Sequence, residues 1–164
     1  MIITYISVAT LLTGVAGAVW YSTRDTRLIR IKRKQVYSFK EAFNLTRLAV
    51  MTFRQDGKPY HFMVDSGSNV TYVDSNSGIK VGKTIAYNDF ISGTGTGQYA
   101  LCPVSLQLED KEYSINAGVT DMKGSFDAVK QNFGVQLSGL IGTDFMKKYN
   151  YCIDFKECVI YERK

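Results

Sequence analysis

Apolar and polar residues alternate in a series of short runs that begins near residue 45. In the first run Leu48, Val50 and Thr52 alternate with residues of the opposite face, and Asp56-Gly57 behind it is a typical hairpin turn. The later runs are rich in Val, Ile, Thr and Tyr, which favour strands. We expect strands at residues 48–53, 60–64, 69–73, 83–91, 99–108, 112–119, 151–155 and 158–161.

Helical spacing is confined to two short segments of this region. Phe126, Val129 and Phe133 lie three and four residues apart, and Gly134 follows in the position of a C-terminal cap. Residues 142–149 predict a second short helix. Many short strands with one or two short helices predict a mainly β domain, a closed antiparallel barrel. The chain has no glycine-rich phosphate-binding loop, which argues against a nucleotide-binding α/β fold.

The N-terminal segment has a different pattern, because residues 2–22 contain no ionisable side chain other than tyrosine. A helix of roughly 20 such residues, at about 1.5 Å per residue, crosses a hydrocarbon core of about 30 Å. Trp20 and Tyr21 stand at its end, where amphipathic rings favour the membrane interface. We therefore expect a single transmembrane helix over residues 1–23, in contact with the lipid bilayer through residues 2–22.

The net charge of the chain, +5, changes this picture only locally. Residues 24–34 (RDTRLIRIKRK) hold six basic groups and one acidic group, so they account for the whole excess. A neutral domain without a basic patch argues against nucleic-acid binding. A basic collar beside an apolar span instead places the following domain in the cytoplasm by the positive-inside rule. The expected order is the span, a juxtamembrane collar and linker over 24–44, and a folded domain over 45–164. Within the linker we expect a short helix or an irregular segment around FKEAF, residues 39–43.

A cleaved signal peptide is the competing interpretation, and it would export the domain. Ala16-Gly17-Ala18 has the form of a cleavage site. However, no Lys or Arg precedes the apolar run, which is longer than the usual signal sequence of about 7–15 apolar residues.

Histidine and cysteine offer little chemistry. His61 is the only histidine, so a Ser-His or Cys-His catalytic mechanism would have to use it. Because it lies within an expected strand, we expect it at a half-buried or edge position instead. Cys102, Cys152 and Cys158 are too scattered to form a set of metal ligands. We expect neither a metal nor a cofactor. For a cytoplasmic domain we expect free thiols, and a Cys152–Cys158 bridge is the alternative for an exported domain, because these two cysteines flank a tight turn.

The strongest chemical motif is Asp65-Ser66-Gly67-Ser68, which directly follows the apolar residues 62–64. The strand fixes the carboxylate, Gly67 permits a tight turn that directs its N–H at that carboxylate, and the Ser68 hydroxyl can donate to its outer oxygen. An ordinary Asx turn at the end of a strand is the structural alternative.

Two further segments make this motif more specific. Residues 92–97 form a glycine-rich tip between two expected strands, and Leu140-Ile141-Gly142 leads into a short helix. With these three motifs in this order, residues 45–161 resemble the retropepsin-like aspartic proteases, which are single-lobed. The tail GLIGTDFMKKYNYCIDFKECVIYER is similar to bacterial members of that family, so we expect a protein of the bacterial inner membrane.

The resemblance implies a retropepsin-like acid-protease barrel and a role for each motif. Asp65 would be catalytic, Ser66 would brace the two active-site loops against each other, and Ser68 would lie beside the outer carboxylate oxygen. Asn69 and Thr143 depart from the pattern, because retroviral members carry an acidic residue and an arginine there. The implied flap tip comprises Ser92, Gly93, Thr94, Gly95, Thr96 and Gly97, and the implied structural step under the active loop comprises Leu140, Ile141 and Gly142.

Acid-protease chemistry requires two carboxylates about 3 Å apart that share a proton. Asp121 and Asp144 lack the Ser/Thr-Gly context, so the second carboxylate would be Asp65 of another chain. The expected enzyme is thus a homodimeric, membrane-anchored aspartic endopeptidase that cleaves peptides or proteins. Residues 10, 14 and 18 form a small-residue face that would let two spans pair. The alternative from another class is a non-proteolytic, membrane-tethered adaptor that binds peptides with the same fold.

Overall fold

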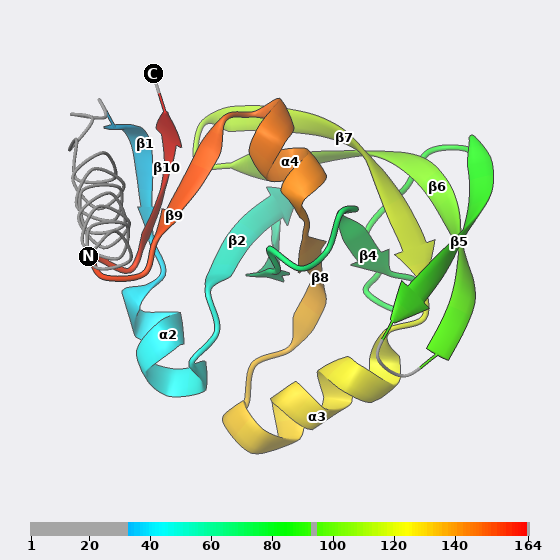
Figure 1. Cartoon of the computed structure of the whole chain (residues 1–164), viewed down its shortest axis with the longest axis horizontal. Coiled ribbons are helices and arrows are strands. Elements are labelled where there is room, and N and C mark those ends of the chain that lie inside the picture. The colour runs from blue at the N-terminus through cyan, green and yellow to red at the C-terminus, as the bar shows by residue number, and fades with distance from the viewer. Residues whose placement is uncertain (1–32, 93–94, 164) are drawn as a thin grey trace, which may run out of the picture. The chain divides into compact units, whose positions relative to one another are not determined.

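The computed structural model describes residues 33–92 and 95–163, which belong to a compact unit that begins at Arg33 (Figure 1). The expected span over 2–22 and all but the end of the basic collar lie outside the described residues. Within the described part of the chain, no helix has the length and apolarity needed to cross a membrane.

The described residues form ten strands and three helices. In chain order they are β1 (Arg33–Ser38), α2 (Lys40–Thr46), β2 (Val50–Gln55), β3 (Lys58–Val64), β4 (Tyr72–Asp74), β5 (Ala86–Ser92), β6 (Gly95–Leu108), β7 (Lys111–Thr120), α3 (Lys123–Phe133), β8 (Leu137–Ile141), α4 (Thr143–Lys148), β9 (Tyr151–Asp154) and β10 (Val159–Arg163).

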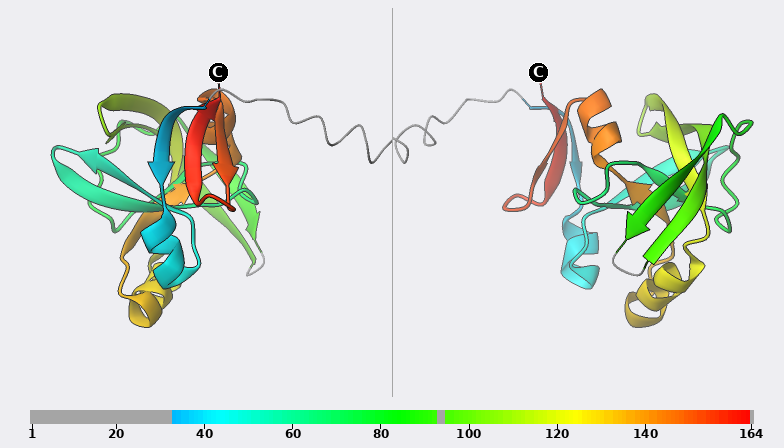
Figure 2. Two further views of the ribbon diagram at one scale, coloured as in Figure 1. Left: turned by 90° about the vertical axis from the view of Figure 1, so that its left-hand side faces the viewer. Right: turned by 45° about the vertical axis from the view of Figure 1, so that its right-hand side comes forward.

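The larger sheet closes into a barrel, as the pattern of short strands predicts. Its strand order is β2-β3-β8-β4-β7-β6-β5, and β2 also pairs with β6 at Arg54 and Gln107. All its strands except β5 therefore form a ring, and β5 extends from β6 at the end of the unit opposite β1 and β10 (Figures 1 and 2). The expected mainly β, closed fold is confirmed.

The expectation of an antiparallel barrel is wrong for two of its pairings. β3 pairs with β8 in parallel, and so does β4 with β7. The first of these pairings involves β8, which lies between β3 and β4 and which the sequence indicates only as the step Leu140-Ile141-Gly142. With five residues and a glycine in its centre, β8 has too little alternation to be recognised as a strand.

The folded unit begins at Arg33, before the expected boundary at Leu45. β1 pairs with β10, which also pairs with β9, in a separate three-stranded sheet. Residues 35–44, expected as a linker, contain most of α2, in agreement with the expected short helix around FKEAF, but they also contain most of β1, which was not expected. The basic residues of the collar continue into β1, and they conceal the strand pattern there.

Aromatic side chains fill the barrel and connect it to the small sheet. Phe53 contacts Phe62 and Phe145 with ring centroids 5.3 and 5.7 Å apart, and all three side chains are buried. The hydroxyls of Tyr113 in β7 and Tyr151 in β9 are 2.5 Å apart. These contacts fix the small sheet against the barrel.

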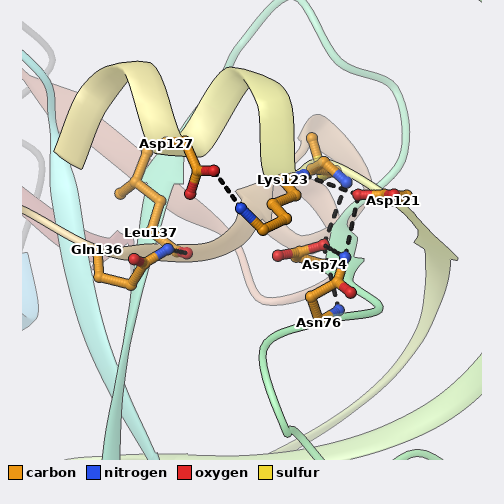
Figure 3. Close-up of polar contacts among 8 residues, drawn as sticks. Asp74, Asn76, Asp121, Lys123, Asp127, Gln136 and Leu137 are labelled. Atoms are coloured by element: carbon orange, nitrogen blue, oxygen red, sulfur yellow. Dashed lines mark hydrogen bonds and ion pairs between the residues drawn. The ribbon is translucent and has the colours of Figure 1, made fainter. Parts of the chain in front are cut away.

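The start of α3 is attached to the end of β4 by a buried carboxylate, Asp74 (Figure 3). Asp74 Oδ1 accepts hydrogen bonds from the backbone N–H groups of Met122 at 3.1 Å and of Asn76 at 3.3 Å, and from the Asn76 amide at 3.2 Å. The Asn76 amide also donates to Asp121 Oδ1, which accepts the N–H of Lys123 as well. This network sets the position of α3 relative to β4.

Replacing Asp74 by alanine is expected to destabilise the domain by about 2 kcal/mol, because the partly buried N–H groups of Met122 and Asn76 lose their acceptor. Urea unfolding of the variant measures this loss. Asp127→Ala is the matched control, because Asp127 pairs with Lys123 at the surface of α3 and its loss is expected to cost less than about 0.5 kcal/mol. Equal losses in the two variants would contradict the role of Asp74.

Candidate active site

The loop that follows β3 holds Asp65 at the point where the β3–β8 ladder ends. The Asp65 N–H donates to the carbonyl of Ile141 at 2.9 Å, so the backbone of Asp65 is still held by the barrel. The N–H of Gly67 donates to Asp65 Oδ1 at 2.9 Å. This bond is the one that the tight turn predicts. Asp65 is partly exposed, and Ser66 and Gly67 are exposed.

Ser68 has a different role from the one expected. Its hydroxyl donates to the carbonyl of Val70 at 2.7 Å instead of to Asp65. A hydroxyl carries a single hydrogen, and this carbonyl takes it within the same turn. The carbonyl of Ser68 accepts from the N–H of Thr143 at 2.8 Å and from its hydroxyl at 3.1 Å. Ser68 therefore joins the loop to the start of α4.

Leu140, Ile141 and Gly142 lie beside the Asp65 loop. Leu140 and Ile141 pair with the last two residues of β3. Gly142 packs against the loop itself, because a Cβ there would lie 2.5 Å from the carbonyl carbon and oxygen of Val70. Glycine is thus required for the close approach of the two backbones.

A buried threonine that sequence reasoning missed connects the same two segments. The Thr71 hydroxyl accepts from the N–H of Gly142 at 3.1 Å and donates to Asp144 Oδ1 at 2.7 Å. Asp144 was considered from the sequence only as a second catalytic carboxylate. In the structure Asp144 Oδ1 accepts hydrogen bonds from the Thr71 hydroxyl and from the backbone N–H of Phe145, the latter at 2.7 Å.

Thr71→Val is expected to destabilise the domain by about 2 kcal/mol, because it leaves the buried N–H of Gly142 and the Asp144 carboxylate without a partner at nearly constant volume. Thermal unfolding compares it with Thr143→Val, which removes only an exposed hydroxyl bond to Ser68. The control is expected to lose less than about 1 kcal/mol. A loss for Thr71→Val no larger than that of Thr143→Val would show that Thr71 does not hold the loop.

The expected glycine-rich tip lies in the hairpin of β5 and β6. Ser92 pairs with Gly95, Ile91 with Thr96 and Phe90 with Gly97. The remaining two tip residues, Gly93 and Thr94, lie outside the described residues.

The other titratable candidates have partners elsewhere. His61 Nδ1 is hydrogen-bonded to the Thr52 hydroxyl at 2.9 Å between β3 and β2, and burial lowers the pKa of His61. Asp121 accepts from Asn76 and from the N–H of Lys123. In residues 33–92 and 95–163 no group of three His, Cys, Asp or Glu side chains could hold a metal ion. The three cysteines are free thiols.

The chain is similar in sequence to a retrovirus-related polyprotein and in structure to a retroviral protease-like domain. The chain is 26% identical over 144 residues to the retrovirus-related Pol polyprotein from transposon 412 of Drosophila melanogaster, covering 87% of this chain and 10% of that polyprotein. It therefore spans about a tenth of the length of this relative. The crystal structure of the retroviral protease-like domain of Ddi1 from Leishmania major has a TM-score of 0.45 and 13% identity, covering 71% of this chain and 94% of that one. No protein-family model matches the chain. The similarity to the polyprotein supports the resemblance to retropepsin-like proteins.

Proposed function

We propose that this chain is an aspartic endopeptidase whose two catalytic carboxylates are the Asp65 side chains of two copies. The observation that carries the proposal is the geometry of the Asp65 loop. A partly exposed carboxylate, anchored through its own backbone to β8, receives the N–H of Gly67, and exposed small residues follow it. An Asx turn that only ended a strand would not need the additional hydrogen bonds that join Ser68 and Thr71 of this loop to Gly142 and α4.

The reaction is hydrolysis by a pair of carboxyl groups that share one proton. The ionised carboxylate takes a proton from water, whose oxygen attacks the carbonyl carbon of the scissile bond, and the protonated partner donates its proton to the carbonyl oxygen. As the tetrahedral intermediate collapses, the first carboxyl group gives the proton that it took from water to the leaving nitrogen and the C–N bond breaks. The second carboxylate recovers its proton from a hydroxyl of the intermediate, which becomes the new carboxylic acid. Two such groups about 3 Å apart cannot both be ionised, so the pair titrates as a unit.

A homodimer supplies the second carboxylate. Each copy contributes one Asp65 loop, and a two-fold axis brings the two loops together. The exposed residues Ser66 and Gly67 are available to face a partner. The apolar segment 2–22, as a membrane span, would raise the effective concentration of the copies, with the domain on the cytoplasmic side of the basic collar.

The substrate that suits this fold is an extended peptide. β5 lies at the end of the larger sheet, and its hairpin with β6 offers main-chain groups to an added strand. Backbone hydrogen bonds would supply most of the affinity, and side-chain contacts would supply the specificity.

A cleavage screen tests the proposal. The full chain in detergent is incubated with a diverse peptide library between pH 4 and 8, and dimers are demonstrated in the same sample by cross-linking. The expected result is cleavage by the wild type and none by Asp65→Ala. Binding of peptides without cleavage by a dimeric wild type would contradict the protease and favour the adaptor.

A further inference from the structure

The outer part of the β5–β6 hairpin has few sheet contacts to keep it in place. We call residues 86–92 and 95–99 the outer hairpin. β5 pairs with β6 and with no other described strand, and β6 pairs with β7 only from Ala100 onward. At the base, Ile85 and Gly82 donate to the carbonyls of Leu101 and Pro103. A two-stranded ribbon is only marginally stable in water. The outer hairpin therefore depends on side-chain contacts for its orientation.

Three aromatic rings provide these contacts. Tyr72 of β4, Phe90 of β5 and Tyr99 of β6 form a cluster with centroid distances of 5.2 Å for Tyr72–Tyr99, 6.3 Å for Tyr72–Phe90 and 6.5 Å for Phe90–Tyr99. Tyr72 meets both partners edge to face, which is a favoured geometry. Tyr99 is buried and the other two rings are half-buried. The cluster links each strand of the hairpin to β4.

Two glycines let the rings lie against the backbone. A Cβ at Gly97 would lie 2.6 Å from Phe90 Cζ, and a Cβ at Gly118 would lie 2.6 Å from Tyr72 Cε1 and 2.8 Å from Tyr99 Cδ2. Any side chain at either position would displace a ring. The fit of Phe90 over Gly97 is thus specific to this pair of residues.

The same cluster is attached to the Asp65 loop. Tyr72 directly follows Thr71, whose hydroxyl bonds Gly142 and Asp144 and whose carbonyl accepts from the N–H of Gly118 at 2.9 Å. The backbone that carries the Tyr72 ring is therefore fixed relative to the loop. On the opposite face of β5 the side chains are open among the described residues: Tyr87 is 68% and Ile91 87% exposed.

We propose that Tyr72, Phe90 and Tyr99 are positioning residues that set the outer hairpin at a fixed orientation to Asp65 and thereby determine the affinity for an extended peptide. The affinity part rests on the proposed function, since it takes the hairpin as the strand to which a peptide is added. The orientation part rests on the contacts alone.

The first test is hydrogen exchange of the full chain in detergent without substrate. Phe90→Ala is expected to speed amide exchange in the outer hairpin about tenfold, since an aromatic contact of about 1.4 kcal/mol corresponds to a tenfold change. Amides of β2, β3 and β8 are expected to keep their rates. Tyr87→Ala is the matched control on the open face, and it is expected to stay within about twofold of the wild type. Equal exchange in Phe90→Ala and Tyr87→Ala would overturn the proposal.

A double-mutant cycle isolates the contact between the ring and the glycine. Gly97→Ala alone is expected to speed exchange in the outer hairpin about as much as Phe90→Ala, because its methyl group displaces the ring. The double variant is expected to be no faster than Phe90→Ala. Additive effects would mean that Gly97 acts independently of the ring.

The second test measures peptide affinity with a fluorescent peptide taken from the cleavage screen. Phe90→Ala is expected to raise KM about tenfold with kcat within about twofold, because the ring acts on binding through the hairpin. If the wild type binds this peptide without cleaving it, the Kd from fluorescence anisotropy replaces KM. Faster exchange with unchanged KM or Kd would overturn the affinity part. Absence of cleavage by the wild type, with tenfold faster exchange in Phe90→Ala, would reject the protease and keep the orientation part.

Discussion

Asp65→Asn is expected to lower kcat for peptide hydrolysis about a thousandfold or more, while the melting temperature stays within about 2 °C of the wild type. An asparagine oxygen can still accept the N–H of Gly67, so the loop keeps the bond that it has around Asp65. What the amide cannot do is take a proton from water or share one with a second carboxyl group. The substitution therefore separates chemistry from folding.

The measurement is the initial rate of cleavage of one library-derived peptide, together with a thermal unfolding curve. Asp110→Asn is the control, because Asp110 is an exposed carboxylate in the turn between β6 and β7 and lies far along the chain from the motif. It is expected to keep the wild-type rate. Residual activity of Asp65→Asn above about a tenth of the wild type would remove Asp65 from the mechanism.

Gly139→Ala is expected to have the largest effect on stability, a loss of about 3 kcal/mol or failure to fold. Gly139 is buried in the centre of β8, where it pairs with β3 and β4 at once. A Cβ there would lie 2.2 Å from the carbonyl oxygen of Tyr72 and 2.4 Å from Phe62 Cε1. The backbone atom cannot move without separating β4 from β8, and this separation would also shift the Asp65 loop.

Gly124→Ala is the matched control, because Gly124 lies exposed in α3 and a Cβ at this position would have no neighbouring atom within 4 Å. Alanine favours a helix more than glycine does, so this variant is expected to gain about 0.5 kcal/mol. Urea unfolding compares the two. A loss below about 1 kcal/mol for Gly139→Ala would mean that β8 is not clamped between its neighbours as described.

The strands and the site motif could be predicted from the sequence because their signals are local. Alternation identifies β6 and β7, and the N–H of Gly67 reaches Asp65 within one turn. β8 could not be recognised in this way, since its five residues are a strand only because two neighbours pair with them. The roles of Thr71 and Asp144 depend on a contact between residues far apart in sequence, and no local pattern indicates it.

The start of the domain was missed for a related reason. β1 is a strand through its pairing with β10, at the other end of the chain, and its own sequence, RKQVYS, resembles a continuation of the basic collar. Ser68 illustrates the limit for side chains, because the sequence suggests Asp65 as the acceptor of its hydroxyl and the structure gives the carbonyl of Val70. Composition and spacing thus identify the Asp65 motif, whereas the contacts that hold its loop in place come from residues far apart in sequence.

The most direct test of the central claim is the activity of a purified heterodimer of wild type and Asp65→Asn, isolated through two different affinity tags. If one catalytic pair requires Asp65 from both copies, this heterodimer is expected to retain less than about a hundredth of the wild-type rate. Half of the wild-type rate would contradict the claim, because each chain would then carry a complete site of its own.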